Sequence, residues 1–256
     1  MGSGSAHPVC WSSMDIYLWI ILIATAAGLV QGLSGFGGAA LAMPLFTLLM
    51  DLQSSVVLVT LLILLIGGLN FLSLPQGNWH SCHLLRLLAA APLGVIVGVL
   101  SLIVVPERIL LLILGLLLVG QGTYELGRWA MPRVDGTRLA YPAGALSGWL
   151  AATVGVPGPP VILYAAFQGW TPLERKTQLV AFLMVIALLT AAGHALAGLT
   201  TQGTLLHFAA AAPALVLSTL LGIRIFERMG EAGQGRAVNM ILVMVGSLLL
   251  FEAASR

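Results

Sequence analysis

The fold of this chain depends on a glycine-rich interruption, Gly32-Leu33-Ser34-Gly35-Phe36-Gly37-Gly38, in an apolar stretch that runs from Ile16 to Met50. An unbroken helix of that length would extend about 52 Å, which is too long for one crossing of a hydrocarbon core of roughly 30 Å. A second apolar stretch, residues 139–168, has a similar interruption, Gly155-Val156-Pro157-Gly158-Pro159-Pro160. Each stretch is therefore predicted to form two helical arms that meet at a non-helical break.

The composition around these breaks is that of an all-α polytopic membrane protein. Of the 256 residues, 59% are hydrophobic and 8% are charged, and the mean hydropathy is +1.03, whereas about 25% of residues are charged in an ordinary soluble domain. The net charge of +2 is too small for a nucleic-acid-binding surface. Cys10 and Cys82 provide no disulfide framework. His80 and His83 are more typical of an interfacial loop than of a metal site, so we expect neither a metal nor a cofactor.

Six further apolar segments have the length that a membrane crossing needs. They are residues 54–74, 84–105, 108–127, 177–199, 203–225 and 235–252. We expect residues 1–13 to be a tag or a disordered N-terminus, because they begin with a Gly/Ser-rich run. The rest of the chain is predicted to form a first membrane repeat (14–128), a cytoplasmic linker (129–137) and a second membrane repeat (138–256).

The basic residues indicate how the two broken stretches lie in the membrane. If each stretch is a hairpin that returns to the side it left, nine basic residues fall on one side: Arg86, Arg128, Arg133, Arg138, Arg175, Lys176, Arg224, Arg228 and Arg236. Arg108 and Arg256 then fall on the other side. This bias obeys the positive-inside rule. It predicts two hairpins and places both termini outside the cytoplasm.

Matching features recur about 120 positions apart. Gly35-Phe36-Gly37-Gly38 aligns with Gly155-Val156-Pro157-Gly158, and residues 89–92 recur as residues 210–213. Each half is then a broken-helix hairpin followed by three transmembrane helices. Because three is odd, the second half enters the membrane from the opposite side. The sequence therefore predicts two inverted-topology repeats, an architecture that is common among secondary transporters.

The two breaks are the predicted substrate site. A helical arm that begins inside a membrane presents backbone N–H groups and the positive end of its dipole, which suit an anion, and glycine lets the backbone approach a ligand closely. The predicted substrate-binding residues are Gln31, Ser34, Gly35, Phe36, Gly37 and Gly38 at the first break, and Thr153, Gly155, Val156, Pro157, Gly158 and Pro159 at the second. The alternative is that the glycines only permit close helix packing. We expect that role for the pairs Gly28/Gly32, Gly94/Gly98 and Gly144/Gly148.

Two titratable residues are candidates for proton coupling. His194 lies in an apolar segment and could carry a proton, although a hydrogen-bonded structural histidine is the simpler interpretation. Glu125 lies three residues before Arg128, so an ordinary ion pair is the simpler interpretation there.

These motifs resemble those of the TauE/SafE sulfite exporter family, also called the toluene sulfonate uptake permease (TSUP) family. The resemblance is carried by residues 32–38 followed by Pro44, by residues 148–160, and by the stretch 220–228. It implies a transporter of small sulfur-containing anions such as sulfite, sulfonates and sulfoacetate in the bacterial inner membrane, and no enzymatic activity. Ala39 and Pro157 stand where many members have glycine, and either could alter the width of the break and so the substrate.

Several alternatives remain open at this stage. A passive channel for a small anion or neutral solute fits the same composition. An intramembrane serine protease would use Ser34, within a Gly-x-Ser-Gly pattern, together with His194; against it, the second break has Val154 in place of the serine. The direction of transport, the coupling ion and the oligomeric state are not determined, although the glycine-rich helix faces allow a homodimer.

Overall fold

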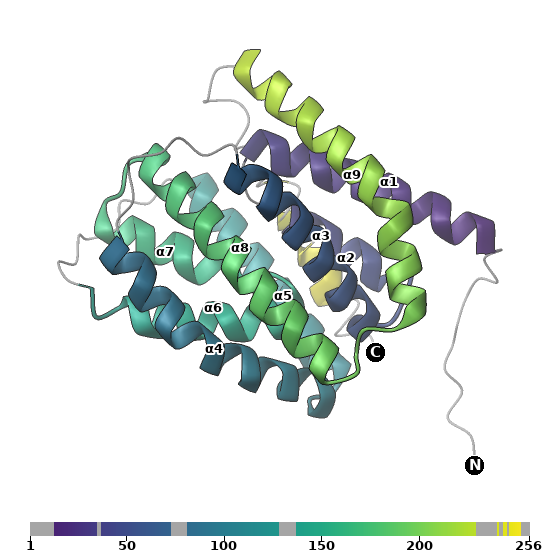
Figure 1. The fold of residues 1–256 in the computed structure, drawn as a ribbon, viewed down its shortest axis with the longest axis horizontal. Helices are drawn as coiled ribbons and strands as arrows, with labels where there is room; N and C mark the ends of the chain where they lie inside the picture. The colour runs from purple at the N-terminus through teal and green to yellow at the C-terminus, as the bar shows by residue number, and fades with distance from the viewer. Residues whose placement is uncertain are drawn as a thin grey trace.

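The computed structural model describes residues 13–34, 37–72, 81–127 and 137–228 and, further along the chain, residues 240, 243–244 and 246–251. The described chain is helical throughout (Figure 1). Its helices are α1 (Ser13–Ser34), α2 (Gly38–Thr47), α3 (Leu52–Leu72), α4 (Ser81–Val104), α5 (Glu107–Gly127), α6 (Ala140–Val154), α7 (Gly158–Gln168), α8 (Pro172–Leu196) and α9 (Gln202–Arg228).

Six of the described helices are long and apolar enough to cross a membrane. These candidate spans are Asp15–Gly32, Leu52–Phe71, Cys82–Val104, Glu107–Tyr124, Thr177–Leu196 and Gln202–Ile225. Five of them coincide with segments that the sequence predicts. The sixth, in α1, is the first arm of the first broken stretch. The protein is therefore a multi-pass membrane protein.

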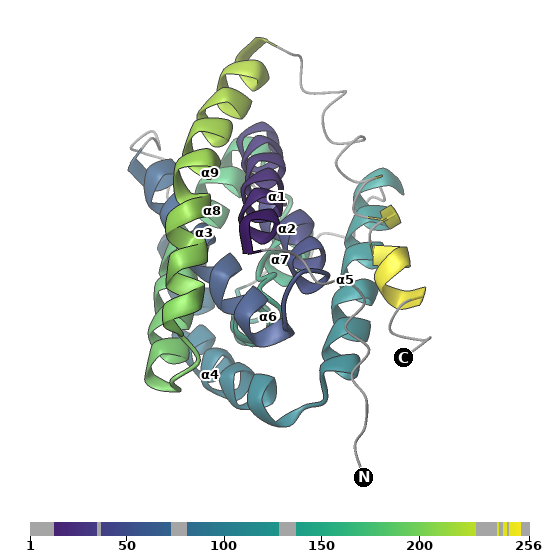
Figure 2. The ribbon, with the colours of Figure 1, turned by 90° about the vertical axis from the view of Figure 1, so that its right-hand side faces the viewer.

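The predicted segment 235–252 is covered only in part. Its described residues, 240, 243–244 and 246–251, are helical. This segment lies against α5 (Figure 2), where a Cβ on Gly115 would come within 2.8 Å of Leu250 Cγ and 3.1 Å of Gly246 O. Small residues on both partners therefore allow the close approach.

Both predicted breaks are present, at the predicted residues. Gly37 precedes α2 with φ of 98°, and Gly155 ends α6 with φ of 67°. These left-handed conformations are unfavourable for residues with a Cβ, which is why glycine is needed at both positions. The backbone N–H groups of Gly155 and Val156 both point to the carbonyl oxygen of Leu150, so the end of α6 is satisfied without a side chain.

The second arms fold back along the first arms. If α1 and α2 were collinear, Ala27 and Gly38 would lie about 16 Å apart at 1.5 Å per residue. Instead, a Cβ on Gly38 would lie 2.6 Å from Ala27 O. In the second pair, the Ser147 hydroxyl of α6 donates a hydrogen bond to the carbonyl oxygen of Pro157, next to the start of α7. Each broken stretch is therefore a hairpin. The second arms, of 10 and 11 residues, are too short to cross a membrane.

Glycines lie at the two most extensive helix–helix contacts, where they let the backbones approach closely. α4 packs on α6, and α1 packs on α9. A Cβ on Gly94 or Gly144 would overlap with a backbone carbonyl of the opposite helix, Ala145 or Leu87 respectively. On the other pair, a Cβ on Gly32 would overlap with Thr219 O. The predicted packing role of the three glycine pairs is confirmed.

Candidate functional site

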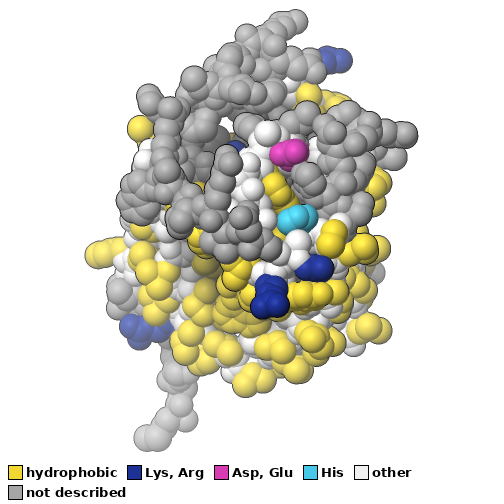
Figure 3. All heavy atoms as spheres, turned by 90° about the vertical axis from the view of Figure 1, so that its left-hand side faces the viewer, with side chains coloured by type: hydrophobic (Ala, Val, Ile, Leu, Met, Phe, Trp, Pro, Cys, Tyr) yellow, Lys and Arg dark blue, Asp and Glu magenta, His cyan; other side chains and the backbone are white. Residues whose placement is uncertain are grey.

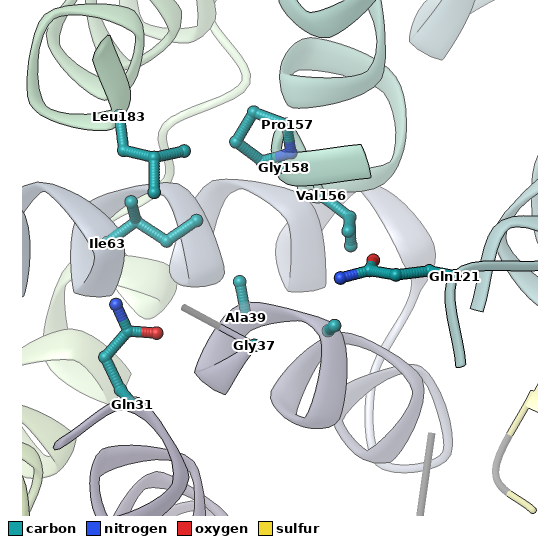
Figure 4. Close-up of a pocket in the computed structure, with 10 residues that line it drawn as sticks. Gln31, Gly37, Ala39, Ile63, Gln121, Val156, Pro157, Gly158 and Leu183 are labelled. Atoms are coloured by element: carbon teal, nitrogen blue, oxygen red, sulfur yellow. The ribbon is translucent and has the colours of Figure 1, made fainter. Parts of the chain in front are cut away.

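The two breaks meet at a cavity of about 40 Å³ inside the bundle (Figure 4). Its lining residues come from six helices (α1, α2, α3, α5, α7 and α8) and from both breaks: Gln31, Gly37, Ala39, Ala40, Ile63, Gln121, Val156, Pro157, Gly158 and Leu183. Figure 4 shows the side chains of Gln31 and Gln121 on opposite sides of the cavity, with the start of α2 below it and Val156 and Pro157 above it. Residues more than 100 positions apart in the sequence therefore form one site.

The first break contributes an amide and the first turn of α2. Gln31, near the end of α1, accepts a hydrogen bond at its Oε1 from the backbone N–H of Gly38, at 3.0 Å. Ala39 and Ala40 follow in the first helical turn, whose N–H groups have no acceptor within the helix. The positive end of the α2 dipole thus lies at the cavity wall. A second cavity of about 20 Å³ adjoins here, and Gln31, Ala39 and Ile63 line both.

The second break contributes fewer donors. α7 begins with Gly158-Pro159-Pro160, and proline has no backbone N–H. Gly158 therefore supplies the free backbone donor of this first turn, and the prolines fix its helical conformation. The side of the cavity formed by α2 is consequently richer in N–H groups than the side formed by α7.

Gln121 of α5 is a site residue that the sequence interpretation did not select. Its side chain is 7% exposed and lines the cavity, and its Oε1 has no hydrogen-bond partner among the described residues. A buried acceptor oxygen without a partner costs about 1–3 kcal/mol, so Oε1 is suited to an ordered water or another donor, while the Nε2 of the same amide is the group that can donate to an anion. The signal in the sequence was a polar residue within a predicted span. Its position near the end of segment 108–127 is also typical of an interfacial residue.

The cavity carries no formal charge on the described lining residues. Its polar groups are two side-chain amides and the backbone N–H groups of helix starts. A cavity of about 40 Å³ has room for about three water molecules. Such a site binds a small solute through neutral donors and helix dipoles, and an anion with several oxygen atoms matches both the donors and the size.

The other predicted site residues lie around the cavity or outside the described chain. The Thr153 hydroxyl donates to Trp149 O of its own helix at 2.7 Å, and Gly155 packs near Met43 and Val59. Neither residue lines the cavity, and Pro159 in the first turn of α7 does not line it either. Gly35 and Phe36 lie outside the described residues, as do the side chains of Ser34 and Glu125.

His194 is fully buried near the end of α8. Its Nε2 lies 3.1 Å from the carbonyl oxygen of Ala152 in α6, and its Nδ1 has no partner among the described groups. His194 therefore makes the hydrogen bond expected of a structural histidine. The free ring nitrogen leaves a second role open.

The chain is similar in sequence to a known protein family. Residues 20–249 match the family described as "Sulfite exporter TauE/SafE". The chain is 29% identical over 178 residues to a protein of Cupriavidus necator named "Probable sulfite/organosulfonate exporter TauE", an alignment that covers 66% of this chain and 70% of that protein. No solved structure matches significantly. The chain therefore belongs to the sulfite exporter TauE/SafE family, whose members are transporters and not enzymes.

Proposed function

We propose that this protein is a secondary transporter that exports a small sulfur-containing anion, sulfite or an organosulfonate, across the bacterial inner membrane. The observation that carries the proposal is the cavity in which both helix breaks meet around Gln31 and Gln121. The name of the Cupriavidus necator relative supports both the class of anion and the outward direction. An inside-negative membrane potential would favour outward movement of an anion by about 2.3 kcal/mol per charge and 100 mV.

The transport mechanism proposed is alternating access between two inverted repeats. Two pairs of cavity residues, Gly37 with Pro157 and Ile63 with Leu183, stand 120 positions apart and line the same cavity. In addition, α1 of the first repeat packs on α9 of the second, and α6 of the second packs on α4 of the first. In each of these contacts a broken-helix arm of one half packs on a long helix of the other half. Such an arrangement supports two related halves that rock against each other around a central site.

The proposed orientation places both termini outside the cytoplasm. Arg86 near the start of α4, Arg138 before α6 and Arg175 near the start of α8 belong to helix starts at one end of the bundle in Figure 1. Figure 3 views this end and shows Lys and Arg side chains beside a broad hydrophobic surface. An end that gathers basic side chains is expected to face the cytoplasm.

The deciding experiment is flux in proteoliposomes that contain the purified protein. We expect saturable movement of sulfite or a small sulfonate, stimulated by a membrane potential, with counterflow against a trapped anion. Gly158→Leu, in the cavity wall, should abolish this flux. The matched control is Gly120→Leu, because a Cβ at Gly120 has no atom of the described residues within 4 Å and Gly120 does not line the cavity. Flux that never saturates would indicate a channel, and absence of flux from folded protein would remove sulfur anions as substrates.

A further inference from the structure

One face of α8 continues from the central cavity toward the end of the helix. Leu183, which lines the central cavity, is followed on the same face by Ala187, Thr190 and His194, at intervals of four, seven and eleven residues. His194 lies two residues before the end of α8 at Leu196. This face therefore connects the middle of the bundle with one of its ends.

A further cavity of about 10 Å³ lies along this face. Thr60, Ile63, Ala151, Pro157, Ile186, Ala187 and Thr190 line it. Ile63 and Pro157 also line the central cavity, so the two spaces share a wall. The volume is close to the lower limit of about 10–15 Å³ that one water molecule needs.

The polar atoms beside this cavity are incompletely satisfied. Thr190 is 1% exposed, and its Oγ1 has no hydrogen-bond partner in the described part of the chain. Thr60 donates to Val56 O at 2.8 Å, which leaves the lone pairs of its hydroxyl oxygen available as acceptors. One turn beyond Thr190, His194 can donate from Nε2 to Ala152 O, and its Nδ1 then carries a free lone pair.

A purely structural role explains these groups poorly. Each buried polar atom left without a partner costs about 1–3 kcal/mol, whereas valine at position 190 would fill a dry core without that cost. Thr190 Oγ1 and His194 Nδ1 lack a partner among the described residues and lie one turn apart on one helix face, and Thr190 lines a cavity next to the central one. The Thr190 hydroxyl can donate to an anion, and the acceptor atoms of Thr60 and His194 can hold water that hydrates it.

We propose that the transported anion passes between the central cavity and one end of the bundle along this face, between Thr60 and Thr190 and past His194. Since Thr60 lies in the first half of α3 and Thr190 in the last third of α8, this end is the one at which α3 begins and α8 ends. The inference rests on the proposed function, because it takes the central cavity as the anion site. It identifies the extracytoplasmic half of the route under the proposed orientation.

Cysteine accessibility tests the route directly. In a background with Cys10→Ser and Cys82→Ser, Thr190→Cys is exposed to a small negatively charged thiosulfonate reagent in proteoliposomes. The matched control is Leu188→Cys on the same helix, where Leu188 is 57% exposed on the apolar outer surface. We expect modification at position 190 at least about tenfold faster than at 188, because the reactive thiolate forms in water and not in lipid. A saturating small sulfonate should slow the reaction at position 190 and leave that at 188 unchanged; the sulfonate is used because sulfite would itself consume the thiosulfonate reagent.

The outcomes separate the route from the substrate. Modification at 190 no faster than at 188 overturns the route, and so does modification that a small sulfonate fails to slow in protein that transports that sulfonate. If Thr190→Cys does not fold, Thr60→Cys on the opposite wall provides the same test. If the protein transports neither sulfur anion but position 190 still reacts faster than 188, the proposed substrate fails and the water-filled route stands.

Discussion

The backbone N–H of Gly38 donates a hydrogen bond of 3.0 Å to Oε1 of Gln31 across the break between α1 and α2. One amide side chain thus joins the end of the first arm to the start of the second and also forms part of the cavity wall. In a hydrocarbon environment this N–H has no water to replace the glutamine. Gln31 therefore links the stability of the hairpin with the chemistry of the site.

Two substitutions at Gln31 separate these roles. Gln31→Leu removes the acceptor and should lower the free energy of unfolding by about 1–3 kcal/mol, which a thermal melt in detergent would detect. Gln31→Glu keeps an acceptor oxygen but puts a carboxyl group at an anion site. It should retain more stability than Gln31→Leu and still reduce sulfite flux roughly tenfold or more, as repulsion of about 1.4 kcal/mol would produce. Undiminished flux in Gln31→Glu would place the anion elsewhere.

Gln121→Leu should reduce transport without reducing stability. The Oε1 of Gln121 is buried without a partner among the described residues, so replacing the amide with an apolar side chain of similar size is expected to be neutral or stabilising. Gln178→Leu is the matched control, since the buried amide of Gln178 also lacks described partners but does not line the cavity. Equal effects of the two variants on flux would contradict a specific role for Gln121.

Alanine at the two helix starts should give opposite results. A Cβ on Gly38 would lie 2.6 Å from Ala27 O and 2.8 Å from Gln31 Cβ, so Gly38→Ala forces backbone movement and should destabilise the protein by about 1–3 kcal/mol. A Cβ on Gly158 would have its nearest neighbour, Ile162 Cδ1, at 3.6 Å. Gly158→Ala should fold normally and lose flux, because the added methyl group reduces the cavity. Melting temperatures and flux measured on the same preparations check both statements.

Ala39 and Pro157, where many members of the family have glycine, both line the cavity. Ala39→Gly removes a methyl group from the wall and should increase the flux of a larger sulfonate relative to sulfite. Ala195→Gly, at an exposed position of α8, serves as control for the general cost of glycine in a helix. An unchanged ratio of the two fluxes would mean that position 39 does not set substrate size.

The glycines of the α4–α6 contact should be intolerant of alanine. A Cβ on Gly94 would overlap with Ala145 O, so Gly94→Ala must separate the two helices and should lower the melting temperature strongly. A Cβ at Gly120 has no neighbour within 4 Å among the described residues, so Gly120→Ala should raise stability by up to about 1 kcal/mol through helix propensity. A similar melting temperature for both variants would show that the close contact contributes little.

The helical architecture could be predicted largely from local sequence. The length of the apolar segments and the low fraction of charged residues indicated a polytopic membrane protein. Both breaks occur at the predicted glycines. The reason is that the backbone at each break takes a positive φ, 98° at Gly37 and 67° at Gly155. Glycine adopts such a φ readily, so a glycine in the sequence indicates where this conformation can occur. The packing glycines were predictable for the same reason, because a missing Cβ is a local property.

The composition of the cavity was decided by tertiary structure. The sequence placed Gln31, Gly37 and Pro157 at the site because they lie at the breaks, but Thr153, also beside a break, bonds its own helix instead. Gln121 reaches the cavity from α5, far from either break in sequence, because helix packing sets which way its side chain points. The sequence by itself thus determined where the chain must break and cross the membrane. Only the packing of distant helices decided which polar groups surround the space between the breaks.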